Sequence, residues 1–178
     1  MEAAIILPLM ATWFVASFVY FDVYRKDNVA VKATYTIGDI LSRQTEVDDD
    51  FIDGLHLLSA FLSDSSPDDT WLRVSSISFN GTSYWVEWSY TSNNQHQLTI
   101  EDLPRISSMV PAMAADETVI LTETNIYYRP LFKVGIAEQY IRHATVTRPR
   151  FAPRLGHATH DLVGSGQGDL CDETSLCF

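Results

Sequence analysis

An uncharged apolar run near the N-terminus constrains this 178-residue chain more than any other feature. Residues 3–21 contain no Asp, Glu, Lys or Arg, and nine of them are Ile, Leu, Val or Phe. A helix rises about 1.5 Å per residue, so this run reaches about 28 Å, close to the ~30 Å hydrocarbon core of a bilayer. It also lacks the polar stripe of a soluble amphipathic helix. We therefore expect residues 1–25 to form a transmembrane helix.

The residues that flank this run argue against a cleaved signal peptide. Such a peptide has basic residues before its apolar segment and small residues after it. Here Glu2 precedes the run and Asp22 follows it. Arg25 and Lys26 come directly after the run, and the positive-inside rule applied to them alone would leave the rest of the chain in the cytoplasm.

The first residues also carry a family resemblance. The chain opens with Glu2-Ala3-Ala4-Ile5-Ile6-Leu7-Pro8-Leu9. This segment resembles the N-terminal signature of the TadE/TadG-like pseudopilins of tight-adherence (Flp) pili, in which a glutamate opens a hydrophobic helix and a proline follows six residues later. Residues 122–132 and 148–150 resemble later strands of the same family more loosely. The likeness is strong over residues 1–45 and loose beyond residue 118.

The resemblance implies a function and a location. The chain would be a minor pilin, a pseudopilin-like subunit or an assembly factor of a type IV pilus of the tight-adherence class. It would cross the bacterial inner membrane once, with its C-terminal domain in the periplasm. Its partners would be membrane lipid, other pilin-like subunits, the pilus assembly machinery and, as a candidate, a second TadE-like protein.

Glu2 and Pro8 are the assembly and recognition residues that the resemblance implies. In the family, a prepilin peptidase removes a basic leader that ends in a small residue shortly before the glutamate. We expect such a leader upstream of Met1, where its charges would hold the N-terminus in the cytoplasm. A carboxylate at the start of a membrane helix is costly unless it is paired. The family explanation for Glu2 is a salt bridge to a neighbouring subunit's N-terminal amine, and the alternative is a solvated residue at the interface.

Periodicity beyond the apolar run predicts an α+β domain over residues 26–154. An apolar stripe at three- and four-residue steps carries the first helix on to about Ser42; its members are Val29, Ala33, Ile37, Ile40 and Leu41. The acidic stretch 46–69 predicts a second helix with a solvated acidic cap, because the spacing of a calcium-binding loop is absent. Strands are expected over residues 71–79, 84–90, 118–128 and 140–147, with a hairpin turn at Asn80-Gly81 and a short helix within residues 99–115. The predicted fold is pilin-like: a long N-terminal helix, transmembrane in its first half, packed on a small antiparallel sheet.

An aromatic row marks the second predicted strand. Tyr84, Val86, Trp88 and Tyr90 alternate along it, so we expect them to share one face of the sheet. Packing of that face on the long helix is the favoured interpretation. The alternative is an exposed platform for a glycan or a peptide, which would make the chain a membrane-anchored periplasmic binding module.

Residues 155–178 are predicted to form a flexible C-terminal tail, because their composition is poor in apolar residues. Cys171 and Cys177 are close enough in sequence to close a small disulfide loop in an oxidising compartment, and two free thiols are the alternative. His157, His160 and Asp161 have the spacing of a metal site, but the glycines around them supply no rigid frame. We therefore expect no bound metal.

Motifs and net charge exclude further function classes. The sequence has no nucleophile elbow, zinc-protease motif, phosphate loop or CxxC pair, so we expect no enzyme activity and no cofactor. A formal net charge of −11 argues against nucleic-acid binding. Acidic residues concentrate between Glu46 and Asp69, and a basic stretch follows later in the chain, at Arg142, Arg148, Arg150 and Arg154. These two stretches predict complementary patches that join neighbouring subunits.

Overall fold

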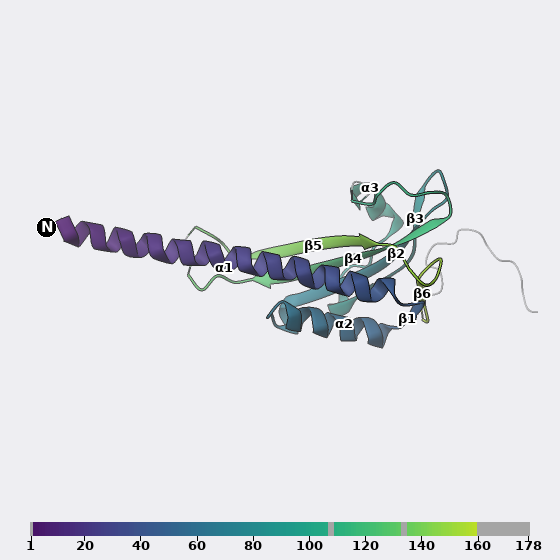
Figure 1. Cartoon of the computed structure of the whole chain (residues 1–178), viewed down its shortest axis with the longest axis horizontal. Coiled ribbons are helices and arrows are strands. Elements are labelled where there is room, and N and C mark those ends of the chain that lie inside the picture. The colour runs from purple at the N-terminus through teal and green to yellow at the C-terminus, as the bar shows by residue number, and fades with distance from the viewer. Residues whose placement is uncertain (1, 107–108, 133–134, 160–178) are drawn as a thin grey trace, which may run out of the picture.

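A long helix and a four-stranded sheet dominate the computed structural model, which describes residues 2–106, 109–132 and 135–159. Helix α1 extends from the N-terminal tip across one face of the sheet, as Figure 1 shows. The helices are α1 (Glu2–Ser42), α2 (Asp49–Leu62) and α3 (Leu103–Ile106), with 3-10 turns at Pro67–Asp69, Ser92–Asn94 and Ile100–Asp102. The strands are β1 (Glu46–Val47), β2 (Thr70–Phe79), β3 (Tyr84–Thr91), β4 (Glu117–Tyr128), β5 (Gln139–Thr147) and β6 (Gly156–His157).

The main sheet is antiparallel, with strand order β3-β2-β4-β5. The two-residue strands β1 and β6 form a separate parallel pair. Helix α1 lies against β4 and β5, and α2 lies against β2, so both long helices cover the same side of the sheet. The predicted α+β class and the packing of the long helix on an antiparallel sheet are confirmed.

The C-terminal half of α1 forms the spine of the domain. Ala33, Ile37 and Leu41 of the predicted stripe are buried. Ile37 and Leu41 belong to an inner cluster between the helices and the sheet, whose members are Ile37, Leu41, Val47, Ile52, Leu55, Leu72, Val74, Trp88, Ile120 and Leu155. Helix and sheet are thus held together by apolar burial, at about 25 cal/mol per Å².

Helix α2 begins where the acidic stretch predicts a helix start. The Asp48 side chain caps it by accepting a 2.8 Å hydrogen bond from the Phe51 backbone N–H. Asp49 and Asp50 lie in the first turn, where the helix dipole favours negative charge. Ile52 and Leu55 turn inward, and Asp48 and Asp50 are exposed, as expected of a solvated cap. Asp49 departs from that expectation, because its Oδ1 is buried 3.3 Å from His157 Nε2.

Strand β3 contains a bulge at Glu87. Trp88 is paired with Ser76, whereas Val86 is paired with Ile77, so Glu87 has no partner residue in β2. An extra residue in one strand breaks the simple alternation of its side chains. Val86 and Trp88, on either side of Glu87, therefore face opposite sides of the sheet.

The bulge makes the prediction of one shared aromatic face wrong. Val86 lies in an outer cluster on the side of the sheet away from α1, with Tyr84 packed against that cluster. Trp88 belongs to the inner cluster, and Tyr90 packs against it. Trp88 is only 3% exposed, so the row does not form an open platform for a glycan or a peptide. Trp88 shares this cluster with Ile37 and Leu41 of the long helix. Tyr90 instead faces α2, where its hydroxyl donates to Asp53 Oδ1 at 3.1 Å.

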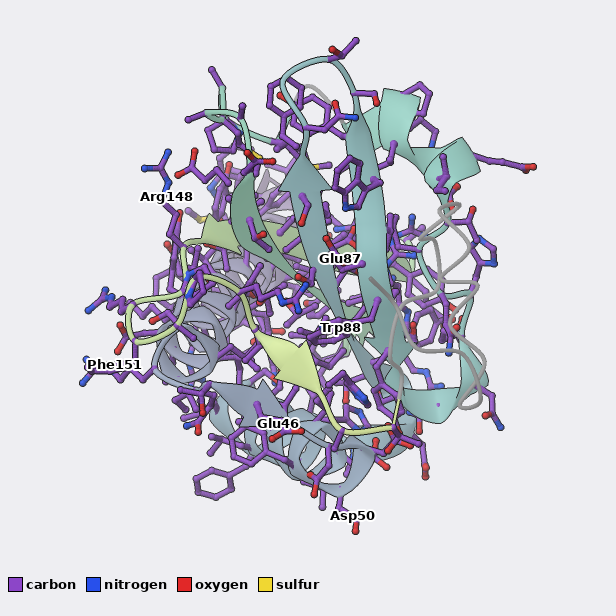
Figure 2. The ribbon with its side chains drawn as sticks, turned by 90° about the vertical axis from the view of Figure 1, so that its right-hand side faces the viewer. Glu46, Asp50, Glu87, Trp88, Arg148 and Phe151 are labelled. Carbon is purple, nitrogen blue, oxygen red and sulfur yellow. The ribbon has the colours of Figure 1, made fainter. Side chains whose placement is uncertain are left out.

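The segment after Arg154 corrects the predicted start of the tail. Leu155 is buried in the inner cluster, and its carbonyl accepts a 2.8 Å hydrogen bond from Trp88 Nε1. Strand β6 then pairs with β1, and the His157 ring packs 4.8 Å from the Trp88 ring. Figure 2, viewed from the end of the domain away from the N-terminus, shows Trp88 close to the yellow-green β6 strand. Residues 155–159 thus belong to the folded domain, because their apolar and backbone groups complete its core.

The remainder of the predicted tail, residues 160–178, lies outside the described residues. The expected cysteine pair, Cys171 and Cys177, falls there, as do His160 and Asp161. His157 is described, and its Nε2 lies 3.3 Å from Asp49 Oδ1. Among the described residues, no group of three or more His, Cys, Asp or Glu is arranged to hold a metal ion.

Gly38 lies at a close approach of α1 to β5 and gives a stability test. A Cβ at Gly38 would lie 2.9 Å from Thr145 Cγ2 and 3.2 Å from Thr147 Cγ2. We expect Gly38→Val to lower the free energy of unfolding by about 2 kcal/mol, because overpacking outweighs the gain in helix propensity. Gly54→Ala in α2 is the matched control, since no atom lies within 4 Å of a Cβ there. It should raise the free energy of unfolding by about 0.5–1 kcal/mol, and denaturant titration of the full chain in detergent measures both changes.

Candidate functional site

The N-terminal half of α1 projects from the domain with an exposed apolar surface. Trp13 is 76% exposed, and the other exposed large apolar residues before Asp22 are Ile6, Leu7, Leu9, Met10, Phe14, Phe18, Tyr20 and Phe21. The helix is long and apolar enough to cross a membrane, and only 6% of its most apolar 18-residue window is buried by the rest of the domain. This low burial distinguishes the apolar segment from the core helix of a soluble protein, which is mostly buried. A helix that is apolar on every side requires lipid or other helices around it.

Polar side chains inside this apolar half are satisfied within the helix itself. Thr12 Oγ1 donates to the carbonyl of Pro8 at 2.9 Å, and Ser17 Oγ donates to the carbonyl of Trp13 at 2.9 Å. Such bonds to the preceding turn hide hydroxyl groups from an apolar surrounding. Pro8 lies within α1 near its start, and Glu2 is the first residue of the helix. The Glu2 side chain lies outside what the structure describes.

A set of polar contacts fixes α1 to the domain where the apolar run ends. We call this set the junction. The Tyr128 hydroxyl donates to Asp22 Oδ2 at 2.8 Å, and His143 Nε2 lies 2.9 Å from Asp27 Oδ1. Lys26 Nζ donates to the carbonyls of Ser63 at 3.2 Å and Asp64 at 2.6 Å, just after the end of α2. A cation at the C-terminal end of a helix interacts favourably with its dipole. The junction therefore sets the direction in which the exposed half of α1 leaves the domain.

The Tyr128 phenol of the junction has a raised pKa. Burial and the hydrogen bond to Asp22 raise the pKa of its phenol to about 12. Both effects disfavour the phenolate, because a second negative charge would lie beside the Asp22 carboxylate. At neutral pH the hydroxyl is therefore available as a donor.

The opposite face of the sheet, away from α1, is divided into a covered part and an open part. The segment after β3 covers one part, and its apolar residues complete the outer cluster: Ile77, Val86, Leu98, Leu103, Ile106, Val110, Met113, Val119 and Leu121. The Leu98 backbone N–H donates to Ser89 Oγ at 2.9 Å and holds this segment to β3.

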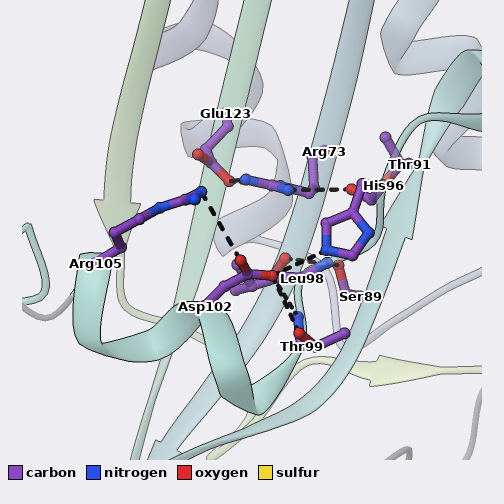
Figure 3. Close-up of polar contacts among 10 residues, drawn as sticks. Arg73, Ser89, Thr91, His96, Leu98, Thr99, Asp102, Arg105 and Glu123 are labelled. Carbon is purple, nitrogen blue, oxygen red and sulfur yellow. Dashed lines mark hydrogen bonds and ion pairs between the residues drawn. The ribbon is translucent and has the colours of Figure 1, made fainter.

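A polar network lies at the boundary of the covered part (Figure 3). Arg73 Nη2 lies 2.6 Å from Glu123 Oε2, and Arg73 Nη1 donates to the carbonyl of His96 at 3.1 Å. His96 Nε2 in turn lies 3.0 Å from Asp102 Oδ2, which also accepts from Thr99. Hydrogen bonds from His96 and Thr99 lower the pKa of the Asp102 carboxyl. The network fixes the segment after β3 to β2 and β4.

The open part of this face contains a groove of about 390 Å³. Its lining includes the aromatic side chains of Trp71, Tyr127 and Tyr140. The Arg129 guanidinium lies 4.9 Å from the ring centre of Tyr127, and the Arg142 guanidinium lies 6.0 Å from that of Tyr140. Tyr127 at the end of β4 and Tyr140 in β5 thus each have an arginine guanidinium beside the ring.

Asn125 lies in this groove between its neighbours Trp71 and Arg142 on the flanking strands. The residue is 2% exposed, and its Oδ1 has no hydrogen-bond partner among the described residues. A buried amide oxygen without a donor costs about 1–3 kcal/mol. A ligand that supplied a hydroxyl or N–H group there would recover part of this free energy.

The sequence did not single out this groove, because its residues come from separate strands. The signal that could have found it is a repeated spacing: Tyr127 and Arg129 are two residues apart, as are Tyr140 and Arg142. Residues two apart in a strand share a face, so two such pairs on adjacent antiparallel strands come together.

The predicted basic patch is partly engaged within the chain. Arg148 Nε lies 2.9 Å from Glu117 Oε1, and Arg150 Nη2 lies 3.2 Å from Asp39 Oδ1. Figure 2 shows Arg148 on the side of the domain away from Asp50. These two arginines act in the fold as partners of nearby carboxylates, which reduces the charge they offer to a neighbouring subunit.

Comparison of the chain with protein-family models, with curated proteins and with solved structures finds no match.

The raised pKa of Tyr128 gives a test of the junction. Because its folded-state pKa of about 12 lies above the ordinary 10.0, the Tyr128 contact stabilises the fold fully below pH 10.0, and this contribution is lost as pH rises towards 12. We expect Tyr128→Phe to lower the midpoint of thermal unfolding at pH 8, and we expect the difference from the parent chain to shrink above pH 10. Tyr35→Phe, at an exposed position of α1, is the control. A difference that stays constant up to pH 12 would contradict this account of the junction.

Proposed function

We propose that this chain is a minor pilin-like subunit or assembly factor of a tight-adherence (Flp) type IV pilus. The proposal places α1 across the bacterial inner membrane and the α+β domain in the periplasm. One observation carries it: α1 is a single 41-residue helix whose apolar first half is exposed and whose second half packs in the core of the domain.

This continuity supports a role in helix-mediated assembly. The exposed half of α1 offers apolar surface on all sides, so it suits lipid before assembly and the helices of neighbouring subunits afterwards. The second half transmits the position of the membrane segment to the domain, because the junction and the inner cluster fix it to the sheet. A subunit of this shape can change its surroundings from lipid to protein without refolding its domain.

Glu2 supplies the polar element that such an assembly requires. Packing of apolar helices alone fixes their register weakly, whereas an ion pair in an apolar surrounding fixes it strongly. Glu2 begins α1, so it belongs to the end of the helix that lies farthest from the domain. The partner in this proposal is the N-terminal amine of an adjacent pilin-like subunit, freed when a leader upstream is removed.

Site-specific cross-linking in cells that carry the pilus genes tests this function. A photo-cross-linking residue at Ile6 lies one turn from Glu2 on the same face of α1. We expect it to capture a pilin-like subunit, whereas the same residue at Phe61, exposed on α2, should not. Glu2→Gln should reduce the yield from Ile6 at least about tenfold, equivalent to ~1.4 kcal/mol.

The matched control is Glu2→Asp, which keeps the negative charge and should keep most of the cross-link. Equal yields from Glu2→Gln and Glu2→Asp would show that the charge plays no part. Capture of only unrelated membrane proteins at Ile6 would contradict the pilin-like function itself.

A second candidate function is that of a membrane-anchored periplasmic binding module for a glycan or a peptide. The groove on the outer face of the sheet favours it, because aromatic ring faces and the unsatisfied Asn125 oxygen lie together there. Asp68 and Asp69 balance the charges of Arg129 and Arg142 in its lining, which suits an uncharged polar ligand better than a strongly acidic one.

Soluble peptidoglycan fragments with amidated carboxyl groups test this second function, since they contain both sugars and short peptides and carry little negative charge. We expect a saturable binding isotherm by calorimetry, weakened about tenfold (~1.4 kcal/mol) by Trp71→Ala. Phe151→Ala is the control, because Phe151 is exposed and lies outside the groove. No binding, or equal loss of binding in both variants, would contradict the binding module.

A further inference from the structure

The connection between β4 and β5 extends beyond the strand ends and runs back along α1 towards the N-terminus (Figure 1). Its described residues are 129–132 and 135–138. The strands themselves end near the junction, where the Tyr128 hydroxyl meets Asp22. The connection, which we call the β4–β5 loop, therefore lies beside the apolar half of α1.

Contacts with α1 fix the level of this loop along the helix. A Cβ at Gly135 would lie 3.7 Å from the Tyr20 hydroxyl oxygen. Ile136 and Val23 pack against one cluster, formed by Ala30, Ile126, Tyr128 and Ile141. Val19, one turn before Val23 on the same face, is only 1% exposed, whereas Phe18 and Tyr20 beside it are exposed. The loop thus lies level with residues 19–23 of α1.

Two large apolar side chains of the loop are exposed. Leu131 is 77% exposed and Phe132 is 51% exposed. Tyr20, Phe21 and Tyr24 of α1 are exposed as well. Leu131 also lines a hollow with Asp22 and Lys26 of α1, so these exposed apolar and aromatic residues lie near the base of the exposed helix. Aromatic residues in such a position are typical of the boundary between a bilayer and water.

The rise of the helix places these residues relative to lipid. Residues 3–21 fill the hydrocarbon core when α1 spans a bilayer, and Asp22 is the first charge after them. Val19 precedes Asp22 by about 4.5 Å of helix, at ~1.5 Å per residue. The interfacial layer on each side of the hydrocarbon core is about 5–8 Å thick. A loop that touches α1 at residues 19–23 must therefore enter the interfacial layer of the same bilayer.

We propose that the β4–β5 loop is a second membrane contact, in which Leu131 and Phe132 insert into the interfacial region of the bilayer that α1 spans. The partner is the phospholipid interface itself, because the loop continues the surface by which α1 meets lipid. A single helix would leave the domain free to tilt, whereas two contacts fix its orientation above the membrane. The inference rests on the proposed membrane anchoring and adds to it a fixed orientation of the domain relative to the membrane.

Depth measurement with spin labels tests the proposal on the full chain. Cys171→Ser and Cys177→Ser remove the native thiols, and the chain is placed in nanodiscs of phosphatidylethanolamine and phosphatidylglycerol. Single spin labels are attached to Phe132→Cys and to Leu131→Cys in separate variants. Leu131 is the more exposed of the two positions. Trp13→Cys reports the hydrocarbon core, and Phe151→Cys reports the end of the domain away from the membrane. Collisions with oxygen and with a water-soluble nickel complex are compared at each position.

We expect the labels at residues 131 and 132 to have an oxygen-to-nickel ratio between those of the two reference positions. A ratio equal to that at residue 151 would overturn the loop contact while leaving the anchor intact. Protection of residues 131 and 132 from both reagents would also overturn it, since a protein surface would then cover them. A water-like ratio at residue 13 would instead contradict the anchoring on which the proposed function depends.

Discussion

The structure depends on one helix that must satisfy two different surroundings. The first half of α1 is apolar on every side and lacks any charge from residue 3 to residue 21, so it requires lipid or other helices. The second half buries only one stripe, at Ala33, Ile37 and Leu41, and so requires the sheet beneath it. The hydrogen bonds and ion pairs of the junction lie between these two halves of α1, just after the apolar run ends. These contacts set the orientation of the domain relative to the apolar half of the helix.

Features with a strong local cause could be predicted from the sequence. Three features follow from helix preferences that act within a few residues. They are the apolar run, the stripe of the second half of α1 and the acidic start of α2. The Asn80-Gly81 pair likewise marks a hairpin, because Gly81 adopts a φ of +89°, a conformation that favours glycine. These elements and their antiparallel arrangement were therefore accessible without coordinates, whereas pilin-likeness stays a prediction.

Features that depend on distant partners were missed. The bulge at Glu87 reverses the face of Trp88 relative to Val86, and no local signal in β3 announces it. Leu155 comes from a segment that looks like a tail, yet it fills a space left between Trp88 and the helices. The groove around Asn125 joins residues of three strands that are distant in sequence. In each case contacts between segments distant in sequence, and not the local composition, determine where the side chain lies.

The most direct test of the central claim asks which parts of α1 and of the domain reach water in living cells. A membrane-impermeant maleimide is applied to spheroplasts that express Trp13→Cys or Phe61→Cys in a chain whose Cys171 and Cys177 are serine. Both positions are exposed in the structure, so folding alone would let both react. We expect labelling at residue 61, in the periplasm, and none at residue 13, in the hydrocarbon core. Equal labelling at the two positions, or protection at residue 61, would contradict it.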